Sequence, residues 1–200
     1  KLQQARHANP LTLLPGNIPI QQCLQRLLER QVDARLCYID LDNFKPFNDI
    51  YGYGKGDEIL LGLAQLLREL CDPRCDFVGH IGGDDFMLVM RSDDWHVRLQ
   101  QLDQRFQQLC RTLYRDEHIQ ANGFTAPDRE GKWRHHDLLN LSIGVISLPG
   151  HQANLYDAAR LAELASRAKH DAKKQRGFSV VLQHPGQPQR EEDAPLNLCN

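Results

Sequence analysis

The sequence contains no apolar run that approaches the ~20 residues needed to cross a bilayer, and no signal-peptide pattern at its start. It also has little excess charge of either sign, since 24 Lys and Arg residues nearly balance 26 Asp and Glu residues for a formal net charge of −2. A surface that binds nucleic acid or anionic membrane by bulk charge is therefore not expected, and any nucleotide site has to be a local feature. We expect a cytoplasmic domain whose full-length protein can still be membrane-attached.

Cysteine and histidine pairs with the spacing of a zinc site are also missing. Neither Cys71 with Cys75 nor the adjacent His135 and His136 has such spacing, and we expect the two histidines at a solvated strand end. A domain of this size does not need disulfides. We therefore expect buried thiols in a reducing cytoplasm for the six cysteines, which are Cys23, Cys37, Cys71, Cys75, Cys110 and Cys199.

The length and composition suit one ordinary globular domain, with 200 residues of which 41% are hydrophobic and 25% charged. We expect this domain to span residues 1–182 and the polar residues 183–200 to form a disordered tail. The chain begins at Lys1 instead of a methionine, so we expect a fragment of a longer protein with neighbouring sensory or membrane domains.

Hydrophobic periodicity predicts the elements of the first half of the chain. A helix is expected from Ile20 to about Val32, then a strand over 35–42, a short helical piece, and a long helix opened by Asp57. Residues 77–81 and 86–90 are two short apolar runs joined through a Gly-Gly-Asp-Asp sequence. They predict a β-hairpin, because glycine supplies the positive φ angles of a tight reversal.

The second half predicts a further helix capped by Ser92-Asp93-Asp94, a protruding hairpin within 115–137, and a strand over 141–148. Asn154 is expected to cap an alanine-rich helix that stops near Gly177, before a last strand over 178–182. The order β-α-β-β-α-β predicts an α+β domain with a central, mainly antiparallel sheet flanked by helices.

Three segments carry candidate chemistry, and the first is Asp40-Leu41-Asp42-Asn43-Phe44-Lys45. Mg²⁺ takes oxygen ligands, commonly one or two carboxylates plus substrate phosphates, so Asp40 and a backbone carbonyl at a strand end suit it. Lys45 stands at a helix start, where its ammonium and the helix dipole both favour a polyphosphate.

The second segment is the Gly-rich stretch from Asn48 to Asp57. The amide of Asn48 offers a donor and an acceptor, and the carboxylate of Asp57 can accept two N–H bonds, a pairing that prefers guanine to adenine. The third is the hairpin tip Gly82-Gly83-Asp84-Asp85, where glycines let phosphates approach the backbone.

Taken singly, these segments have ordinary structural explanations: a solvated strand end, a helix cap and a turn. Together, in this order and at these spacings, they predict a magnesium–nucleotide site.

These residues resemble the GGDEF (diguanylate cyclase) domains, in the variant form GGDDF. Residues 40–57 are similar to the family's D-x-D-x-F-K-x-x-N-D-x-x-G-H-x-x-G-D, and residues 82–86 read GGDDF. Residues 9–15 resemble D-x-L-T-G-L-P, and 141–145 resemble the family's later strand. The match extends over nearly the whole chain and implies the palm-like fold of nucleotide cyclases.

The resemblance implies that two domains face each other in an antiparallel homodimer and condense two GTP molecules into cyclic di-GMP. It implies catalytic roles for Asp85 and Lys45, and a metal site for Mg²⁺, or alternatively Mn²⁺. The implied metal ligands are Asp40, the Leu41 carbonyl, Asp84 and Asp85. The implied contacts to GTP are Phe44, Lys45, Asn48, Tyr53, Asp57, Gly82, Gly83, Lys169 and Lys173. Asp42 is left as a structural residue.

The sequence departs from the family pattern at several places. Asp85 replaces the usual Glu, and a catalytic group misplaced by ~1 Å can cost ~10²-fold in rate. Tyr53 stands where His is usual, and His80 stands where an Arg is common. The product-inhibition motif R-x-x-D is incomplete, because Asp76 fits but Arg74 is one residue late, so we expect weak or absent feedback inhibition.

Lys169 and Lys173 share a helical face by their spacing, which suits either triphosphate contacts or a solvated basic face. Three functions remain open at this stage. The first is an active or weakly active cyclase. The second is a non-catalytic module that binds GTP or cyclic di-GMP and regulates an attached domain such as a phosphodiesterase. The third, a nucleotide-independent interaction module, would leave the metal and guanine residues without a use.

Overall fold

The computed structural model describes residues 7–128, 130–175 and 177–184. Its centre is a five-stranded sheet in the order β2-β3-β1-β6-β7, built from β2 (Phe77–Gly82), β3 (Asp85–Met90), β1 (Ala34–Asp42), β6 (Asn140–Leu148) and β7 (Ser179–Gln183). All neighbouring strands are antiparallel except β6 and β7. The expected α+β class with a mainly antiparallel sheet is confirmed.

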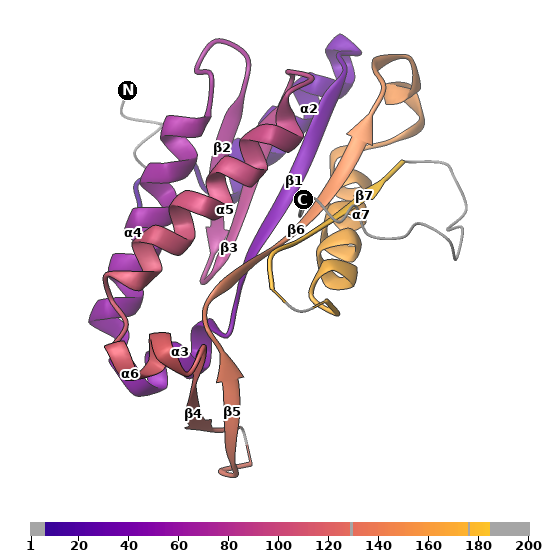
Figure 1. Cartoon of the computed structure of the whole chain (residues 1–200). Helices are drawn as coiled ribbons and strands as arrows, with labels where there is room; N and C mark the ends of the chain where they lie inside the picture. Colours follow the sequence, from indigo (N-terminus) through magenta and orange to yellow (C-terminus); the bar gives the residue numbers. More distant parts are fainter. Residues whose placement is uncertain (1–6, 129, 176, 185–200) are drawn as a thin grey trace.

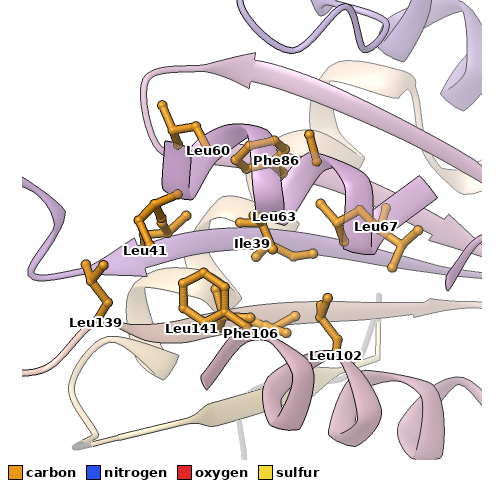
Figure 2. Packing of buried hydrophobic residues seen from close by; sticks show 14 of the residues in the cluster. Ile39, Leu41, Leu60, Leu63, Leu67, Phe86, Leu102, Phe106, Leu139 and Leu141 are labelled. Atoms are coloured by element: carbon orange, nitrogen blue, oxygen red, sulfur yellow. The ribbon is translucent and has the colours of Figure 1, made fainter. Parts of the chain in front are cut away.

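Helices cover both faces of this sheet (Figure 1). One core forms beneath α4 (Tyr53–Leu70) and α5 (Trp95–Arg111), and the other forms beneath α2 (Asn17–Arg30) and α7 (Ala158–Ala172). Figure 2 shows the first core, in which Ile39 of β1 lies between Leu63 of α4 and Phe106 of α5. Because side chains alternate along a strand, the polar residues Asp40 and Asp42 of β1 turn to the α7 side.

A second, two-stranded sheet of β4 (Gly123–Pro127) and β5 (Trp133–Asp137) projects from one end of the domain (Figure 1). It is the protruding hairpin expected within 115–137, and His135 and His136 lie in its strand β5. The chain reaches it through α6 (Asp116–Gln120), a short helix that the sequence pattern does not predict.

Two sequence-based expectations on helix starts are wrong. The long helix α4 begins at Tyr53, four residues before Asp57, so Gly54 and Gly56 are helical. Asn154 lies in a 3-10 helix over Gly150–Leu155, and Asp157 caps α7 instead by accepting the backbone N–H of Arg160 at 2.7 Å. The expected start of α5 is confirmed, since Asp94 is its N-cap residue, although the Asp94 side chain makes no capping hydrogen bond.

The cysteines are less uniformly buried than expected. Cys37 and Cys110 are buried, whereas Cys23, Cys71 and Cys75 are only partly buried, and all five are free thiols. The expected disordered tail begins too early, because Gln183 lies in β7, and residues 185–200, with Cys199, lie outside the described residues. No helix in the described part of the chain is long and apolar enough to span a membrane.

The end of β1 positions the candidate site. The chain turns at Asn43, whose φ of 62° is in the left-handed region, directly into α3 (Phe44–Tyr51). Gly52, with φ 84°, then redirects the chain into α4. This places α3 and the first turn of α4 beside the end of the strand that carries Asp40.

Candidate functional site

Two carboxylates from different strands face each other at the centre of the site. The β1–β3 register pairs Asp40 directly with Asp85. Both project to the α7 face, because Ile39, Leu41 and Phe86 beside them fill the opposite core. Asp40 is only 4% exposed. Burying a carboxylate is costly unless a counter-charge accompanies it, so this arrangement requires a cation.

Lysines of α7 supply that cation. The Lys169 ammonium donates to Asp40 Oδ2 at 3.2 Å and to Asp85 Oδ1 at 3.1 Å, and Lys173 donates to Asp40 Oδ1. Gly144 of β6 allows this approach, since a Cβ there would lie 2.0 Å from the Lys169 backbone nitrogen. The two predicted phosphate contacts therefore belong to the site, where they bind carboxylates.

The burial of these groups shifts their pKa values. Desolvation raises the pKa of Asp85 and of Asp84, although the Lys169 ammonium beside Asp85 opposes the shift. Burial also works against the Lys169 ammonium, but its hydrogen bond to Asp85 and the charge of Asp40 outweigh burial and raise its pKa. Lys169 therefore stays protonated and places a positive charge between the two carboxylates.

The backbone of the hairpin tip has positive φ angles, which favour glycine, and the space around it is open. Gly82 has φ 151° and Gly83 has φ 57°, and a Cβ at either position would meet nothing within 4 Å. A β-bulge between His80 and Gly82 turns the tip. The space beside the backbone of the tip is therefore open, and the approach of a phosphate to it stays a prediction.

His80, which sequence reasoning noted only as a departure, holds this tip. Its ring stacks on Phe86, and its Nε2 lies 3.0 Å from the Gly83 carbonyl and its Nδ1 2.9 Å from Thr12 Oγ1. Burial lowers the pKa of His80 and favours the neutral ring. Since a carbonyl only accepts, Nε2 carries the hydrogen and Nδ1 accepts from the Thr12 hydroxyl.

The predicted guanine-reading residues lie at the contact of α3 with α4. Asn48 Oδ1 is buried and has no hydrogen-bond partner. A Cβ on Gly56 would lie 1.9 Å from this oxygen, so only glycine lets the amide sit there. Asp57 and Tyr53 are exposed on the same end of α4. The unsatisfied oxygen is the kind of acceptor that a ligand N–H would complete.

Of the two residues that begin α3, Phe44 is partly buried and Lys45 is exposed to solvent. Phe44 packs on the edge of the core. The Lys45 side chain is 66% exposed and pairs with Asp49 at 2.8 Å along α3. The structure therefore leaves Lys45 outside the cluster of Asp40, Asp85 and the α7 lysines.

Asp42 is tied to the neighbouring strand. Its Oδ2 accepts the Ser142 hydroxyl of β6 at 2.5 Å, and burial raises the pKa of Asp42 to about 6. No cue in the sequence identifies Ser142 as its partner, because only the β1–β6 register brings the two residues together.

Arg74 and Asp76, the residues that resemble the product-inhibition motif, form ion pairs with other residues of the domain. The Asp76 side chain is fully buried and pairs with Arg98 of α5 at 2.8 Å, while Arg74 pairs with Asp72 at the surface. Arg74 and Asp76 line a pocket of about 210 Å³ together with Arg26 and Arg30 of α2. The two motif residues thus have different partners and do not form one unit.

The donor set at the centre fits a hard cation. Within residues 7–128, 130–175 and 177–184, no three His, Cys, Asp or Glu side chains are already gathered as a metal-binding group. The Lys169 ammonium nevertheless stands between Asp40 and Asp85, and so marks where a cation is favoured. These two carboxylates, with Asp84 close enough to feel the charge of Asp40, are of the ligand type that Mg²⁺ takes when phosphates complete its shell.

Known proteins resemble the chain over most of its length. Residues 7–177 match the family model described as "Diguanylate cyclase, GGDEF domain". The chain is 30% identical over 184 residues to diguanylate cyclase DgcN of Escherichia coli, which aligns 90% of this chain with 40% of that protein. It is 29% identical over 163 residues to the bifunctional diguanylate cyclase/cyclic di-GMP phosphodiesterase MucR of Pseudomonas aeruginosa, with 78% and 24% covered. The chain therefore spans less than half the length of these relatives.

Solved structures share the fold. The GGDEF domain of TpbB (YfiN) from Pseudomonas aeruginosa has a TM-score of 0.62 and 23% identity, with 88% of this chain and 94% of that chain covered. A diguanylate cyclase/phosphodiesterase from Caldicellulosiruptor saccharolyticus has a TM-score of 0.65 and 17% identity, with 94% and 100% covered. With the glycine-bounded tip, the paired carboxylates and the extent of the family match, this chain belongs to the GGDEF (diguanylate cyclase) domain family.

Proposed function

We propose that this chain is the cyclase domain of a diguanylate cyclase, condensing two GTP molecules into cyclic di-GMP with release of two pyrophosphates. The observation that carries the proposal is the pairing of Asp40 with Asp85 beside an open Gly82-Gly83 tip. Among its relatives, DgcN is named a diguanylate cyclase.

The guanine base would bind at the α3–α4 contact. Asn48 supplies a buried acceptor without a partner, and Asp57 supplies an exposed carboxylate on the adjoining helix end. A carboxylate that accepts two N–H bonds favours guanine over adenine, which has no such pair of donors on one edge. Phe44 and Tyr53 would add apolar contact to the nucleotide.

The triphosphate would lie between the hairpin tip and α7. Backbone at Gly82 and Gly83 is accessible, and Lys169 and Lys173 project to the same place. Lys45 would reach a phosphate by leaving Asp49, a surface partner that costs little to lose.

Asp40, the Leu41 carbonyl, Asp84 and Asp85 would hold Mg²⁺ or Mn²⁺. When bound, this ion supplies charge neutralisation at the phosphates and acidifies a bound hydroxyl. Asp85 would accept the proton of the 3′-hydroxyl. The 3′-oxygen then bonds to the α-phosphorus of the GTP on the facing copy, and the bond to pyrophosphate breaks. Because each copy holds one GTP, two copies must face each other antiparallel.

A second function is favoured by two features of the site. Lys169 already binds both metal-site carboxylates, and Asp85 is one methylene shorter than the usual Glu. A domain that binds GTP or cyclic di-GMP without turnover, and regulates an attached domain such as a phosphodiesterase, fits these features. The name of MucR, one of the relatives, shows that a diguanylate cyclase and a cyclic di-GMP phosphodiesterase can occur in one protein.

One assay separates the two functions. The chain is incubated with GTP and Mg²⁺, and cyclic di-GMP is sought by mass spectrometry, with Asp40→Asn as the matched control. The cyclase proposal predicts product from the wild type and none from the control. GTP binding without product would refute the cyclase and leave the binding module.

A further inference from the structure

The Lys169 ammonium lies between the two carboxylates at the centre of the site. It lies 3.2 Å from Asp40 Oδ2 and 3.1 Å from Asp85 Oδ1, and the Lys169 side chain is only 13% exposed. The Tyr38 ring lies 4.5 Å from the same ammonium. A buried ammonium that contacts two carboxylates and an aromatic ring is held in one position more firmly than an ammonium in a surface ion pair.

The backbone that carries Lys169 has little freedom to move. A Cβ at Gly144 would lie 2.0 Å from the Lys169 nitrogen and 2.5 Å from the Ala168 carbonyl carbon, so α7 lies directly against β6. Ala165, Ala168 and Ala172 of the same helix are fully buried. Any change of partner by Lys169 must therefore come from its flexible side chain.

The carboxylates that Lys169 binds are the ones that the proposed reaction needs for its metal. One ammonium and one metal ion compete for the same oxygen atoms of Asp40 and Asp85. The same ammonium also lies on the side of the sheet where the triphosphate would bind. Lys169 can therefore satisfy only one set of acceptors at a time.

We propose that Lys169 is a built-in counter-cation of the metal site, which neutralises Asp40 and Asp85 in the nucleotide-free domain and transfers to the triphosphate when metal binds. This inference rests on the proposed function. It makes Lys169 a positioning residue that weakens metal binding in the absence of nucleotide. Metal and nucleotide would then enter together, because the phosphates give the displaced ammonium a new partner.

Replacing Lys169 should change the affinities for metal and nucleotide in opposite directions. Lys169→Met is one atom shorter than lysine, keeps an unbranched apolar stem and removes the charge. Without nucleotide, this variant should bind Mn²⁺ about ten times more tightly than the wild type, a difference that corresponds to about 1.4 kcal/mol. In the presence of Mn²⁺ it should bind a non-hydrolysable GTP analogue more weakly than the wild type.

The matched control is Lys174→Met, because Lys174 is 68% exposed and pairs with Asp171 at the surface. It should leave both affinities unchanged. Free Mn²⁺ can be followed by electron paramagnetic resonance, and the melting temperature should rise more on adding Mn²⁺ to Lys169→Met than to the wild type. Lys169→Gln, with circular dichroism as a check of folding, serves if the methionine variant does not fold.

Equal or weaker Mn²⁺ binding by a folded Lys169 variant would overturn the inference, and so would a lack of Mn²⁺ binding by all proteins. An unchanged affinity for the GTP analogue would overturn it as well, because the transfer to the triphosphate would be absent. If the two affinities change in opposite directions but no cyclic di-GMP forms in the product assay, the inference about Lys169 is supported and only the proposed cyclase activity is refuted. The two failures are thus distinguishable.

Discussion

Asn48 and Gly56 fit together so closely that a Cβ on Gly56 would stand 1.9 Å from Asn48 Oδ1. The amide oxygen is buried and has no partner among the described residues. Glycine inside a helix costs about 1 kcal/mol relative to alanine. Gly56 therefore lowers the intrinsic stability of α4, but it leaves the space that the Asn48 amide occupies.

Gly56→Ala should weaken GTP binding without unfolding the domain. The added methyl group displaces a flexible amide, while the helix gains intrinsic propensity, so the melting temperature should stay the same or rise. We expect the dissociation constant for GTP, measured by isothermal titration calorimetry, to increase at least about tenfold. Gly54→Ala is the control, since a Cβ at Gly54 meets nothing within 4 Å, and it should bind GTP as the wild type does. Wild-type affinity in Gly56→Ala would contradict the role of Asn48.

Asp85→Glu should raise turnover. The longer side chain carries its carboxylate about one methylene further from the backbone, and a misplacement of ~1 Å can cost ~10²-fold in rate. The initial rate of cyclic di-GMP formation should therefore rise by roughly ten- to a hundredfold, on the same argument. GTP affinity, measured in parallel, should change little. A rate equal to or below that of the wild type would show that the short carboxylate does not limit the chemistry.

Asp76→Ala should destabilise the domain. The Asp76 carboxylate binds Arg98 and also accepts the backbone N–H groups of Asp72 and Arg91. Removing it takes the 2.8 Å ion pair from a guanidinium that is only 12% exposed, and leaves it Ser92, the Leu70 carbonyl and Asp94 at 3.9 Å, so we expect a cost of about 3 kcal/mol in the free energy of unfolding. Urea denaturation measures this cost. Asp72→Ala, which removes the surface partner of Arg74, should unfold close to the wild type, and equal effects of the two variants would refute the structural role of Asp76.

Asp42 should make stability depend on pH. Burial raises its pKa from 3.8 to about 6, against the opposing effects of the Ser142 hydrogen bond and the Lys173 charge. Because the folded pKa is the higher one, this group stabilises the fold at low pH, and the contribution is lost as the pH rises through about 6. Asp42→Asn should therefore gain stability relative to the wild type above about pH 6, with metal removed by chelator. A constant difference in unfolding free energy across this range would contradict the shift.

Local sequence patterns predicted the strands and the hairpin tip correctly, because their signals are short-range. The alternation around Ile39 and the glycines at 82 and 83 determine a strand end and a reversal without reference to the rest of the chain. The resemblance to the family pattern then predicted that these segments belong to one GGDEF domain, which the family match confirms.

Contacts that depend on strand register and helix packing were not predictable in this way. The pairing of Asp40 with Asp85 needs the β1–β3 register, and the bond from Lys169 to both needs α7 to lie against Gly144. The cap of α7 was assigned to Asn154, because several polar residues precede the helix and only the packed structure selects Asp157. The start of α4 was placed too late because Gly54 and Gly56 look like helix breakers, yet the close contact with Asn48 requires glycine at position 56 within that helix.

The most direct test of the proposed condensation measures both products of one reaction. The chain is incubated with GTP and Mg²⁺, and cyclic di-GMP and pyrophosphate are quantified together over time. The proposed reaction predicts two pyrophosphates for each cyclic di-GMP, with neither formed by Asp40→Asn. Bound GTP that yields no cyclic di-GMP, or pyrophosphate released without it, would contradict the proposal.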